Sequence, residues 1–231
     1  LFSAGRTSAG IDLLKTAWKM DKDDAILTYG LATLQQLAGQ REAARTVLLQ
    51  GSASLEEARA LWEELQQDAE YPLVSILIPT YNRPELFEQT LKSACAQTYT
   101  NLEVLVCDNS TNDFTERLME KYAQNLRVKY YRNKAAKTKA ENFQPFEQMA
   151  KGEYLQWLMD DDILHPEKIA KMIKCFQQNP QVTLVTSERG AIDAEGRVLP
   201  KPYTGFVDIQ GEYRIYSGDL NLLFCDVLKH D

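Results

Sequence analysis

Short apolar runs alternate with helical segments from residue 72 onward, and this alternation constrains the fold more than any other feature of the chain. Each run has the length of a strand, and the segments between runs carry apolar residues at helical spacing. Such an alternation predicts an α/β fold, with a mostly parallel sheet that has helices on both faces. The expected strands are residues 73–78, 102–107, 127–131, 154–158 and 182–186, and the expected helices are residues 84–94, 113–123, 140–150 and one opened by Pro166.

Polar residues follow three of these strands at the point where each strand ends. Residues 80–82 follow the first strand, residues 108–110 follow the second, and three consecutive aspartates, Asp160 to Asp162, follow the fourth. The carboxyl ends of the strands in an open parallel sheet face one crevice. We therefore expect three distant segments to build a single site.

The three aspartates are candidates for metal binding. Mg²⁺ and Mn²⁺ prefer hard oxygen ligands, and one or two carboxylates together with substrate phosphates usually hold such an ion. Neighbouring side chains diverge in an extended segment, so we expect one or two of the three to reach the ion and another to bind a ribose hydroxyl. The alternative is an acidic cap for the helix that Pro166 opens. Their position after a buried strand favours the metal site.

Asp108 and a basic segment after the third strand are candidates for nucleotide binding. The Asp108 carboxylate can accept a hydrogen bond from a nucleobase N–H, with Tyr81 lining the base pocket, although a turn aspartate is the alternative. The sequence contains no glycine-rich phosphate loop, so a metal and basic side chains must hold any phosphate. The alternative for the basic segment is a solvated loop. Its members are Arg132, Lys134, Lys137 and Lys139, and Asn142 follows them.

The composition is that of an acidic globular protein. The chain has 231 residues, 44% hydrophobic content and a formal net charge of −7, which argues against a general nucleic-acid-binding protein. No apolar stretch approaches the roughly 18 residues of a membrane span, and the N-terminus lacks a signal-peptide pattern. The four cysteines lie far apart, so we expect reduced thiols in a cytoplasmic protein. Because no initiator Met begins the chain, we expect it to be cut from a longer protein.

Residues 1–70 are expected to form a separate α-helical region of four antiparallel helices. Apolar residues recur there at helical spacing, and Gly39 and Gly51 mark the ends of helices. Ser54 and Glu57 fit a capping box that opens the last helix.

Part of this helical region is similar to a known repeat. The segment 27–32, followed by residues 42–45, resembles part of a tetratricopeptide repeat. Small residues at helix crossings give the same pattern, so both interpretations remain open at this point.

Four motifs occur in order between Pro72 and Pro200. They are VSILIPTYNRP at 74–84, SACAQTY at 93–99, VCDNST at 106–111, and KGEY at 151–154 leading to the three aspartates. Through these motifs the chain resembles the family 2 glycosyltransferases, which have a Rossmann-like GT-A fold. The resemblance implies a GT-A domain over residues 71–231 that transfers a sugar from a nucleotide-sugar donor to an acceptor hydroxyl, with inversion at the anomeric carbon.

The resemblance also implies roles for individual residues. The three aspartates take the place of the family's DXD element, with Asp161 and Asp162 as ligands of Mn²⁺ or Mg²⁺ and Asp160 in a hydrogen-bonding role. The other expected donor-binding residues are Pro79, Thr80, Tyr81, Asn82, Arg83, Asp108, Lys137, Lys139 and Asn142.

The chain departs from the family pattern in three places. The common Asp-Asp-Gly-Ser element reads Cys-Asp-Asn-Ser at 107–110, and Met159 stands where the first acid of Asp-x-Asp-Asp is usual. No convincing match to the family's catalytic base precedes Asp231, so we expect the base to lie beyond it and the acceptor-binding part to be truncated. The weaker candidates for the base are Asp208, Asp219 and Asp226.

These observations predict a metal-assisted enzyme that uses a UDP-sugar and a saccharide or lipid-linked acceptor in bacterial polysaccharide or glycoconjugate synthesis. We expect it in the cytoplasm or at the inner face of the membrane, with the N-terminal helices free to bind a protein partner. One alternative is a metal-dependent sugar-phosphate nucleotidyltransferase, which would release pyrophosphate. The other is a non-catalytic helical assembly module with a vestigial nucleotide site, which would not respond to substitution of Asp161 or Asp162.

Overall fold

The computed structural model describes residues 4–52, 54–68, 70–187 and 192. The chain divides into two compact units, Leu1–Pro166 and Glu167–Asp231. The domain division that the sequence suggests at residue 70 stays a prediction. None of the described helices is long and apolar enough to cross a membrane.

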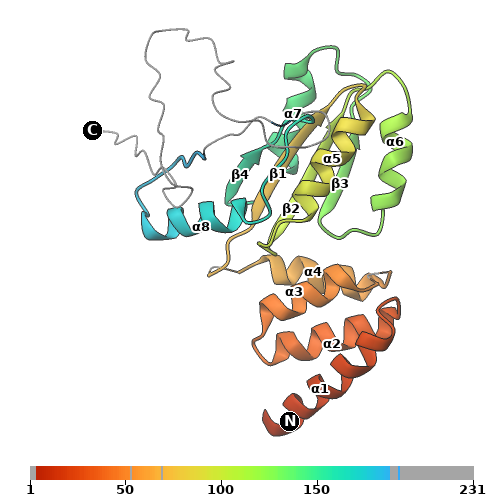
Figure 1. Cartoon of the computed structure of the whole chain (residues 1–231), viewed down its shortest axis with the longest axis vertical. Helices are drawn as coiled ribbons and strands as arrows, with labels where there is room; N and C mark the ends of the chain where they lie inside the picture. The colour runs from red at the N-terminus through yellow and green to blue at the C-terminus, as the bar shows by residue number, and fades with distance from the viewer. Residues whose placement is uncertain (1–3, 53, 69, 188–191, 193–231) are drawn as a thin grey trace. The chain divides into compact units, whose positions relative to one another are not determined.

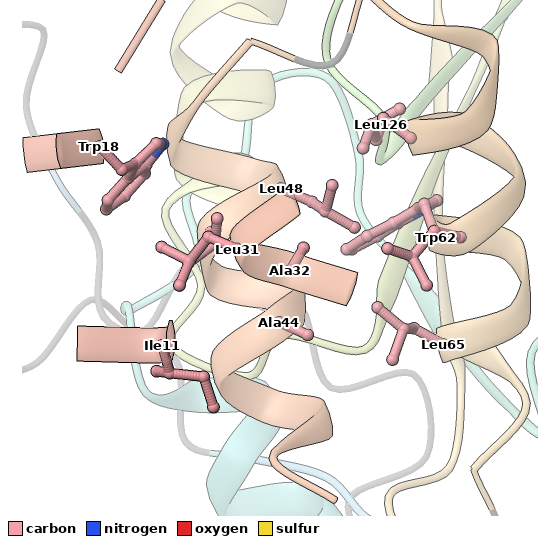
Figure 2. Close-up of a cluster of buried hydrophobic side chains, with 12 residues drawn as sticks. Ile11, Trp18, Leu31, Ala32, Ala44, Leu48, Trp62, Leu65 and Leu126 are labelled. Atoms are coloured by element: carbon pink, nitrogen blue, oxygen red, sulfur yellow. The ribbon is translucent and has the colours of Figure 1, made fainter. Parts of the chain in front are cut away.

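Four helices precede the sheet, as predicted. They share an apolar core that includes Leu31, Leu48 and Trp62, and Leu126 from the sheet region joins this core (Figure 2). Burial of such side chains is the main favourable contribution to packing amphipathic helices together. The helices are α1 (Ala4–Met20), α2 (Ala25–Leu37), α3 (Arg41–Gln50) and α4 (Glu56–Gln66).

The helix ends confirm two of the predicted signals and correct a third. Gly39 follows α2 with a φ of 76°, in the left-handed region that favours glycine, and Gly51 caps α3. The capping box predicted at Ser54 is wrong, because Leu55 is the N-cap of α4 and no side chain caps that helix. The Ser54 hydroxyl instead accepts a hydrogen bond from the Ser52 hydroxyl at 3.3 Å.

The sheet of the first unit has four parallel strands in the order β3-β2-β1-β4 (Figure 1). The order places β1 beside both β2 and β4, so the switch point lies between β1 and β4. This arrangement confirms the predicted α/β fold class. The strands are β1 (Val74–Thr80), β2 (Leu102–Asp108), β3 (Val128–Arg132) and β4 (Tyr154–Trp157), and the accompanying helices are α5 (Pro84–Cys95), α6 (Phe114–Met119), η1 (Glu120–Tyr122) and α7 (Lys139–Met149).

Both faces of the central strands are covered. Every residue of β1 and β2 is buried, which explains why these strands are continuous apolar runs in the sequence. Leu77 and Leu105 pack against Phe146 of α7 on one face. Ile76 and Ile78 point to the other face, because successive side chains alternate, and they are also fully buried.

The fifth strand predicted at 182–186 is wrong, because that segment has no strand geometry. In the second unit, Val182 and Val185 both pack against Cys175 of α8 (Lys168–Gln178). Two residues three positions apart cannot face the same side of a strand, whose side chains alternate with a period of two. The chain therefore lies irregularly along α8. The hairpin-like residues 194–196 and the apolar residues 220–228 lie outside the described residues.

A buried polar junction joins the helices to the amino ends of the strands within the first unit. Arg45 of α3 is 1% exposed, and its guanidinium donates to the Leu65 carbonyl at 2.8 Å and to the Thr100 hydroxyl at 3.3 Å. It also lies over the Tyr71 ring, 4.8 Å from the centroid, and pairs with Asp68 at 3.3 Å. The junction is fixed by directional contacts, and it lies at the end of the sheet opposite to the predicted crevice.

Candidate functional site

Two segments meet at the switch point, where β1 and β4 end. The Thr80 hydroxyl at the end of β1 donates to Asp160 Oδ2 at 3.0 Å, and the Tyr81 backbone N–H lies 3.4 Å from the same oxygen. Asp160 is 1% exposed. A buried carboxylate needs hydrogen bonds to offset the loss of hydration, and these two donors supply them. Asp160 therefore ties the end of β1 to the loop after β4.

Arg83 links the same loop to the start of α5. Its guanidinium pairs with the Asp160 carboxylate and, through Nη1, with Asp161 Oδ2 at 2.8 Å. Burial alone would lower the pKa of Arg83, but the carboxylates of Asp160 and Asp161 outweigh it and raise that pKa. The first two of the three aspartates thus share one cationic partner. Pro84 lies at the first position of α5, as the sequence predicts.

The segment that carries the three aspartates is also anchored to α5 through its backbone. The Thr90 hydroxyl donates to the Asp162 carbonyl at 2.8 Å, and the Leu164 N–H donates to the Ser93 hydroxyl at 3.1 Å. The Asp162 carboxylate itself makes no hydrogen bond or ion pair with another described residue, and it is exposed. The backbone is therefore held while this carboxylate stays open to solvent.

Asp108 ends β2 as a fully buried carboxylate. Its Oδ1 accepts a hydrogen bond from the Ser110 N–H at 2.7 Å, and its Oδ2 accepts from the Tyr130 hydroxyl at 2.7 Å and pairs with Arg132. Burial and the hydrogen bond to Asp108 raise the pKa of Tyr130, so this phenol stays protonated as the donor. Both oxygens of Asp108 thus have protein partners, and its contact with a nucleobase stays a prediction.

Asn82 connects the loops after β1 and β2. Its backbone adopts a φ of 54°, which asparagine tolerates better than most residues. The Asn82 N–H donates to the Ser110 hydroxyl at 2.8 Å, and its Oδ1 accepts from the Thr111 N–H at 2.9 Å. With this left-handed backbone conformation, Asn82 contacts the loop that follows β2.

An open cleft of about 960 Å³ lies beside the ends of β2 and β3. Tyr81, which is 49% exposed, lines one side. Four cationic side chains and two acidic ones, Asp113 and Glu116, line the cleft, so its net positive charge suits an anionic ligand such as a diphosphate. The three aspartates are not among the described residues that line it. The cationic residues are Arg132, Lys134, Lys137 and Lys139.

The capping box of α7 and the backbone contact of Asn142 were not predicted from the sequence. The Thr138 hydroxyl and the Glu141 carboxylate form a capping box that opens α7 and shapes the lysine-bearing loop. Asn142 is buried and donates to the Cys107 carbonyl at 2.9 Å, while its Oδ1 has no hydrogen-bond partner among the described residues. The pattern Thr-x-x-Glu predicts the cap. The contacts that Tyr130 and Arg132 make with Asp108 cannot be predicted from sequence spacing.

The structure brings most of the predicted site residues to the carboxyl ends of the strands. Thr80, Arg83, Asp160 and Asp161 form one connected group at the switch point, and Asp108 and Asn82 form a second through Ser110. Lys137 and Lys139 line the cleft, and Pro79 is buried within β1. The positions of Asp208, Asp219 and Asp226 lie outside the described residues.

The donor atoms at the switch point fit a divalent cation only in part. Carboxylate oxygens are suitable ligands, and Asp161 and Asp162 are both exposed. No group of three or more His, Cys, Asp or Glu side chains is arranged for metal binding in the part of the chain that the structure describes. An ion held here would need water or phosphate oxygens to complete its coordination, and Arg83 already pairs with Asp161.

Two family profiles match the sequence. The family described as "Glycosyl transferase family 2" matches residues 75–228, which is more than half of the chain. The family described as "Tetratricopeptide repeat" matches residues 1–69.

Several curated proteins are similar to part of this chain. Protein CgeD of Bacillus subtilis is 28% identical over 134 residues, which are 54% of this chain and 31% of CgeD. An uncharacterized glycosyltransferase of Rickettsia typhi is 36% identical over 114 residues, 49% of this chain and 35% of that protein. Chondroitin synthase of Escherichia coli is 32% identical over 135 residues, 57% of this chain and 19% of the synthase. The chain thus spans about a third of the first two and about a fifth of the third.

Solved structures show a weaker likeness. Staphylococcus aureus TarS 1-349 has a TM-score of 0.47 and 24% identity, with coverage of 56% of this chain and 38% of TarS 1-349. The mannosyltransferase PcManGT from Pyrobaculum calidifontis, in complex with GDP-Man and Mn²⁺, has a TM-score of 0.44 and 20% identity, with coverage of 67% and 45%. Scores at this level carry no argument about the ligands of this chain.

Proposed function

The chain belongs to glycosyltransferase family 2, and from this premise we propose that it transfers a sugar from a UDP-sugar to an acceptor hydroxyl with inversion at the anomeric carbon. The donor nucleotide binds at the carboxyl ends of β1, β2 and β4. The acceptor is a saccharide or lipid-linked saccharide, and the reaction belongs to polysaccharide or glycoconjugate synthesis in a bacterium. The cytoplasm or the inner face of the membrane is the proposed location.

The connection between Thr80, Asp160 and Arg83 carries this proposal. It supports a site at the switch point, where ligands bind in open α/β sheets. The adjoining cleft supplies four cationic side chains for a diphosphate, and exposed Tyr81 offers a ring for the nucleobase. Asp108 is the proposed acceptor for the base N–H, which requires one of its present partners, Tyr130 or Arg132, to yield. Asn142 holds the end of β2 in place beneath the cleft.

Asp161 and Asp162 are the proposed ligands of Mn²⁺ or Mg²⁺. When bound, the ion stabilises the negative charge that develops on the departing nucleoside diphosphate. Lys137 and Lys139 neutralise the same charge from the cleft side, and Asp160 keeps the loop in register with β1. These residues orient the donor so that its anomeric carbon faces the acceptor.

Inverting transfer also requires a general base. The base takes the proton of the acceptor hydroxyl while the new C–O bond forms and the bond to the diphosphate breaks. No described residue is assigned to this role, and we propose that the base lies outside the described residues. The division into a helical region at 1–70, which offers a surface to a protein partner, and a catalytic region from 71 is part of the same proposal.

Calorimetric titration of UDP into the protein tests the donor site. We expect binding in the presence of Mn²⁺ that chelator weakens and that Asp161→Ala or Asp162→Ala abolishes. Asp23→Ala removes an exposed acid between α1 and α2 and serves as the matched control, with unchanged binding. Equal UDP affinity in all four proteins would contradict the proposed site.

Product analysis tests the reaction class. Incubation with a UDP-sugar and an acceptor should release UDP and no pyrophosphate. Release of pyrophosphate from a nucleoside triphosphate and a sugar phosphate would instead identify a nucleotidyltransferase.

A further inference from the structure

Arg83 pairs with the Asp161 carboxylate, which the proposed function assigns to a divalent cation as a ligand. Its Nη2 pairs with Asp160, and its Nη1 lies 2.8 Å from Asp161 Oδ2. A guanidinium presents its N–H donors in a rigid planar fork, so one arginine can bridge two carboxylates. The bridge is possible only because β1 and β4 are neighbours, which brings residues 83 and 160–161 together.

The two ends of this bridge differ in burial. The Asp160 side chain is 2% exposed and also accepts hydrogen bonds from Thr80 and Tyr81, so this end is fixed. The side chains of Arg83 and Asp161 are 43% and 46% exposed. Ion pairs open to water contribute little to stability, and their partners exchange readily. The contact between Arg83 and Asp161 is therefore the end that can open.

Within the described residues, the Arg83 side chain makes hydrogen bonds only with the carboxylates of Asp160 and Asp161. Arg83 is the N-cap residue of α5, but its side chain makes no capping hydrogen bond. Beside it, the exposed Asp162 carboxylate makes no hydrogen bond or ion pair with another described residue. Among the described residues, the adjacent exposed carboxylate that could serve as a second ligand beside Asp162 is that of Asp161, with which the guanidinium pairs.

Two cations within a few ångströms repel each other strongly unless water separates them. We propose that Arg83 and a divalent cation compete for the Asp161 carboxylate, and that the bound cation releases the guanidinium to bind the donor diphosphate. Arginine is suited to this second partner because its fork matches phosphate oxygens. The inference rests on the proposed function, since it assigns the order of events at the same site.

Titration with Mn²⁺ alone, without nucleotide, tests the competition. We expect Arg83→Gln to bind Mn²⁺ about fivefold more tightly than the unmodified protein, because the competing ion pair is weak. Arg83→Lys, which can reach only one carboxylate at a time, should give an intermediate affinity. Arg59→Gln removes an exposed arginine of α4 that contacts Gln124 and serves as the control, with no change.

A second titration, with UDP at saturating Mn²⁺, tests the release of the guanidinium. Arg83→Gln should bind UDP about tenfold more weakly, because a charge-assisted contact to phosphate is lost. Tighter Mn²⁺ binding with weaker UDP binding is a pair of opposite effects that a merely structural role would not produce. Thermal unfolding of each variant confirms that the fold is retained.

The outcomes separate this inference from the proposed function. Unchanged or weaker Mn²⁺ binding by Arg83→Gln overturns the competition, as does the absence of Mn²⁺ binding from every variant. If UDP binds in either of those cases, the donor site stands and only the inference fails. If Mn²⁺ binding tightens as expected but no variant binds UDP, the release step and the proposed donor site both fail.

Discussion

Arg45 and Arg83 lie at opposite ends of the parallel strands, and both pair with aspartates, yet their surroundings differ. Arg45 is 1% exposed, and carbonyl, hydroxyl, carboxylate and aromatic groups surround its guanidinium. Arg83 is 43% exposed and contacts two carboxylates. A guanidinium enclosed by mixed partners is fixed, whereas the half-exposed guanidinium of Arg83 can exchange its one exposed partner, Asp161. The comparison separates an end of the sheet that is fixed by buried contacts from the end at which we propose the donor site.

The largest expected effect is at the buried end. Arg45→Ala should lower the free energy of unfolding by about 3 kcal/mol, because Asp68 loses the buried one of its two arginine partners and the Leu65 carbonyl and Thr100 hydroxyl lose this donor. Urea denaturation followed by circular dichroism measures the change. Arg41→Ala removes a more exposed partner of the same Asp68 and should cost about 1 kcal/mol. Equal losses in both variants would break the distinction between fixed and exchangeable arginines.

A glycine next to β4 tests how tightly the strand end is packed. A Cβ at Gly152 would lie 2.5 Å from the Ser75 backbone nitrogen, so Gly152→Ala should cost about 2 kcal/mol. Gly30→Ala in α2 meets only Leu14 at an ordinary 3.7 Å and should stabilise the protein by about 0.5–1 kcal/mol. The two substitutions thus have opposite predicted signs in the same urea experiment.

Alkaline pH should lower the free energy of unfolding through buried groups near the amino ends of the strands. Burial raises the pKa of the Cys95 thiol to about 11 and also raises the pKa of Tyr99. Because the native protein retains these protons where the unfolded chain releases them, the stabilising effect of the Cys95 thiol is complete below pH 9 and is lost as pH rises to about 11. The decline caused by Tyr99 begins only near pH 10, the ordinary pKa of tyrosine.

Urea denaturation between pH 8 and pH 11 measures this loss, which for one thiol is at most about 1.4 kcal/mol per pH unit. Cys95→Ser removes the titrating thiol and should flatten the decline. A pH dependence identical to that of the unmodified protein would show that this thiol is not responsible.

The smallest expected effect on stability is at the exposed end. Arg83→Gln should lower the free energy of unfolding by only about 1 kcal/mol, because buried Asp160 loses its cation but keeps the hydrogen bonds from Thr80 and Tyr81. The contact to exposed Asp161 contributes little. The same urea experiment provides the measurement, with Arg45→Ala as the contrasting variant. A loss as large as that of Arg45→Ala would show that Arg83 is structural and would remove the basis of the comparison.

Much of the fold could be predicted, because buried parallel strands are continuous apolar runs and their carboxyl ends must converge. Two local predictions were wrong. At 182–186 the apolar pattern suggested a strand, but Val182 and Val185 pack against α8. At Ser54 the pattern suggested a cap, but Leu55, which packs against the helical core, is the N-cap residue. Periodicity in sequence reports which residues are buried and does not reveal the partner that buries them.

The candidate site was also predictable only in part. The convergence of residues 80–83, 108 and 160–162 followed from topology, since each segment ends a strand. The pairing of Arg83 with two of the aspartates did not, because it depends on which strands are neighbours and on rotamers. Tyr130 and Arg132, which contact Asp108, were not predicted as its partners for the same reason.

Hydrogen–deuterium exchange with and without UDP and Mn²⁺ tests the central claim most directly, because it reports both ends of the sheet in one experiment. We predict slower exchange in peptides that cover residues 80–83, 109–112 and 160–163, with no change in peptides of α3 and α4. Protection confined to the helices, or no protection under conditions where calorimetry shows binding, would contradict a donor site at the carboxyl ends of the strands.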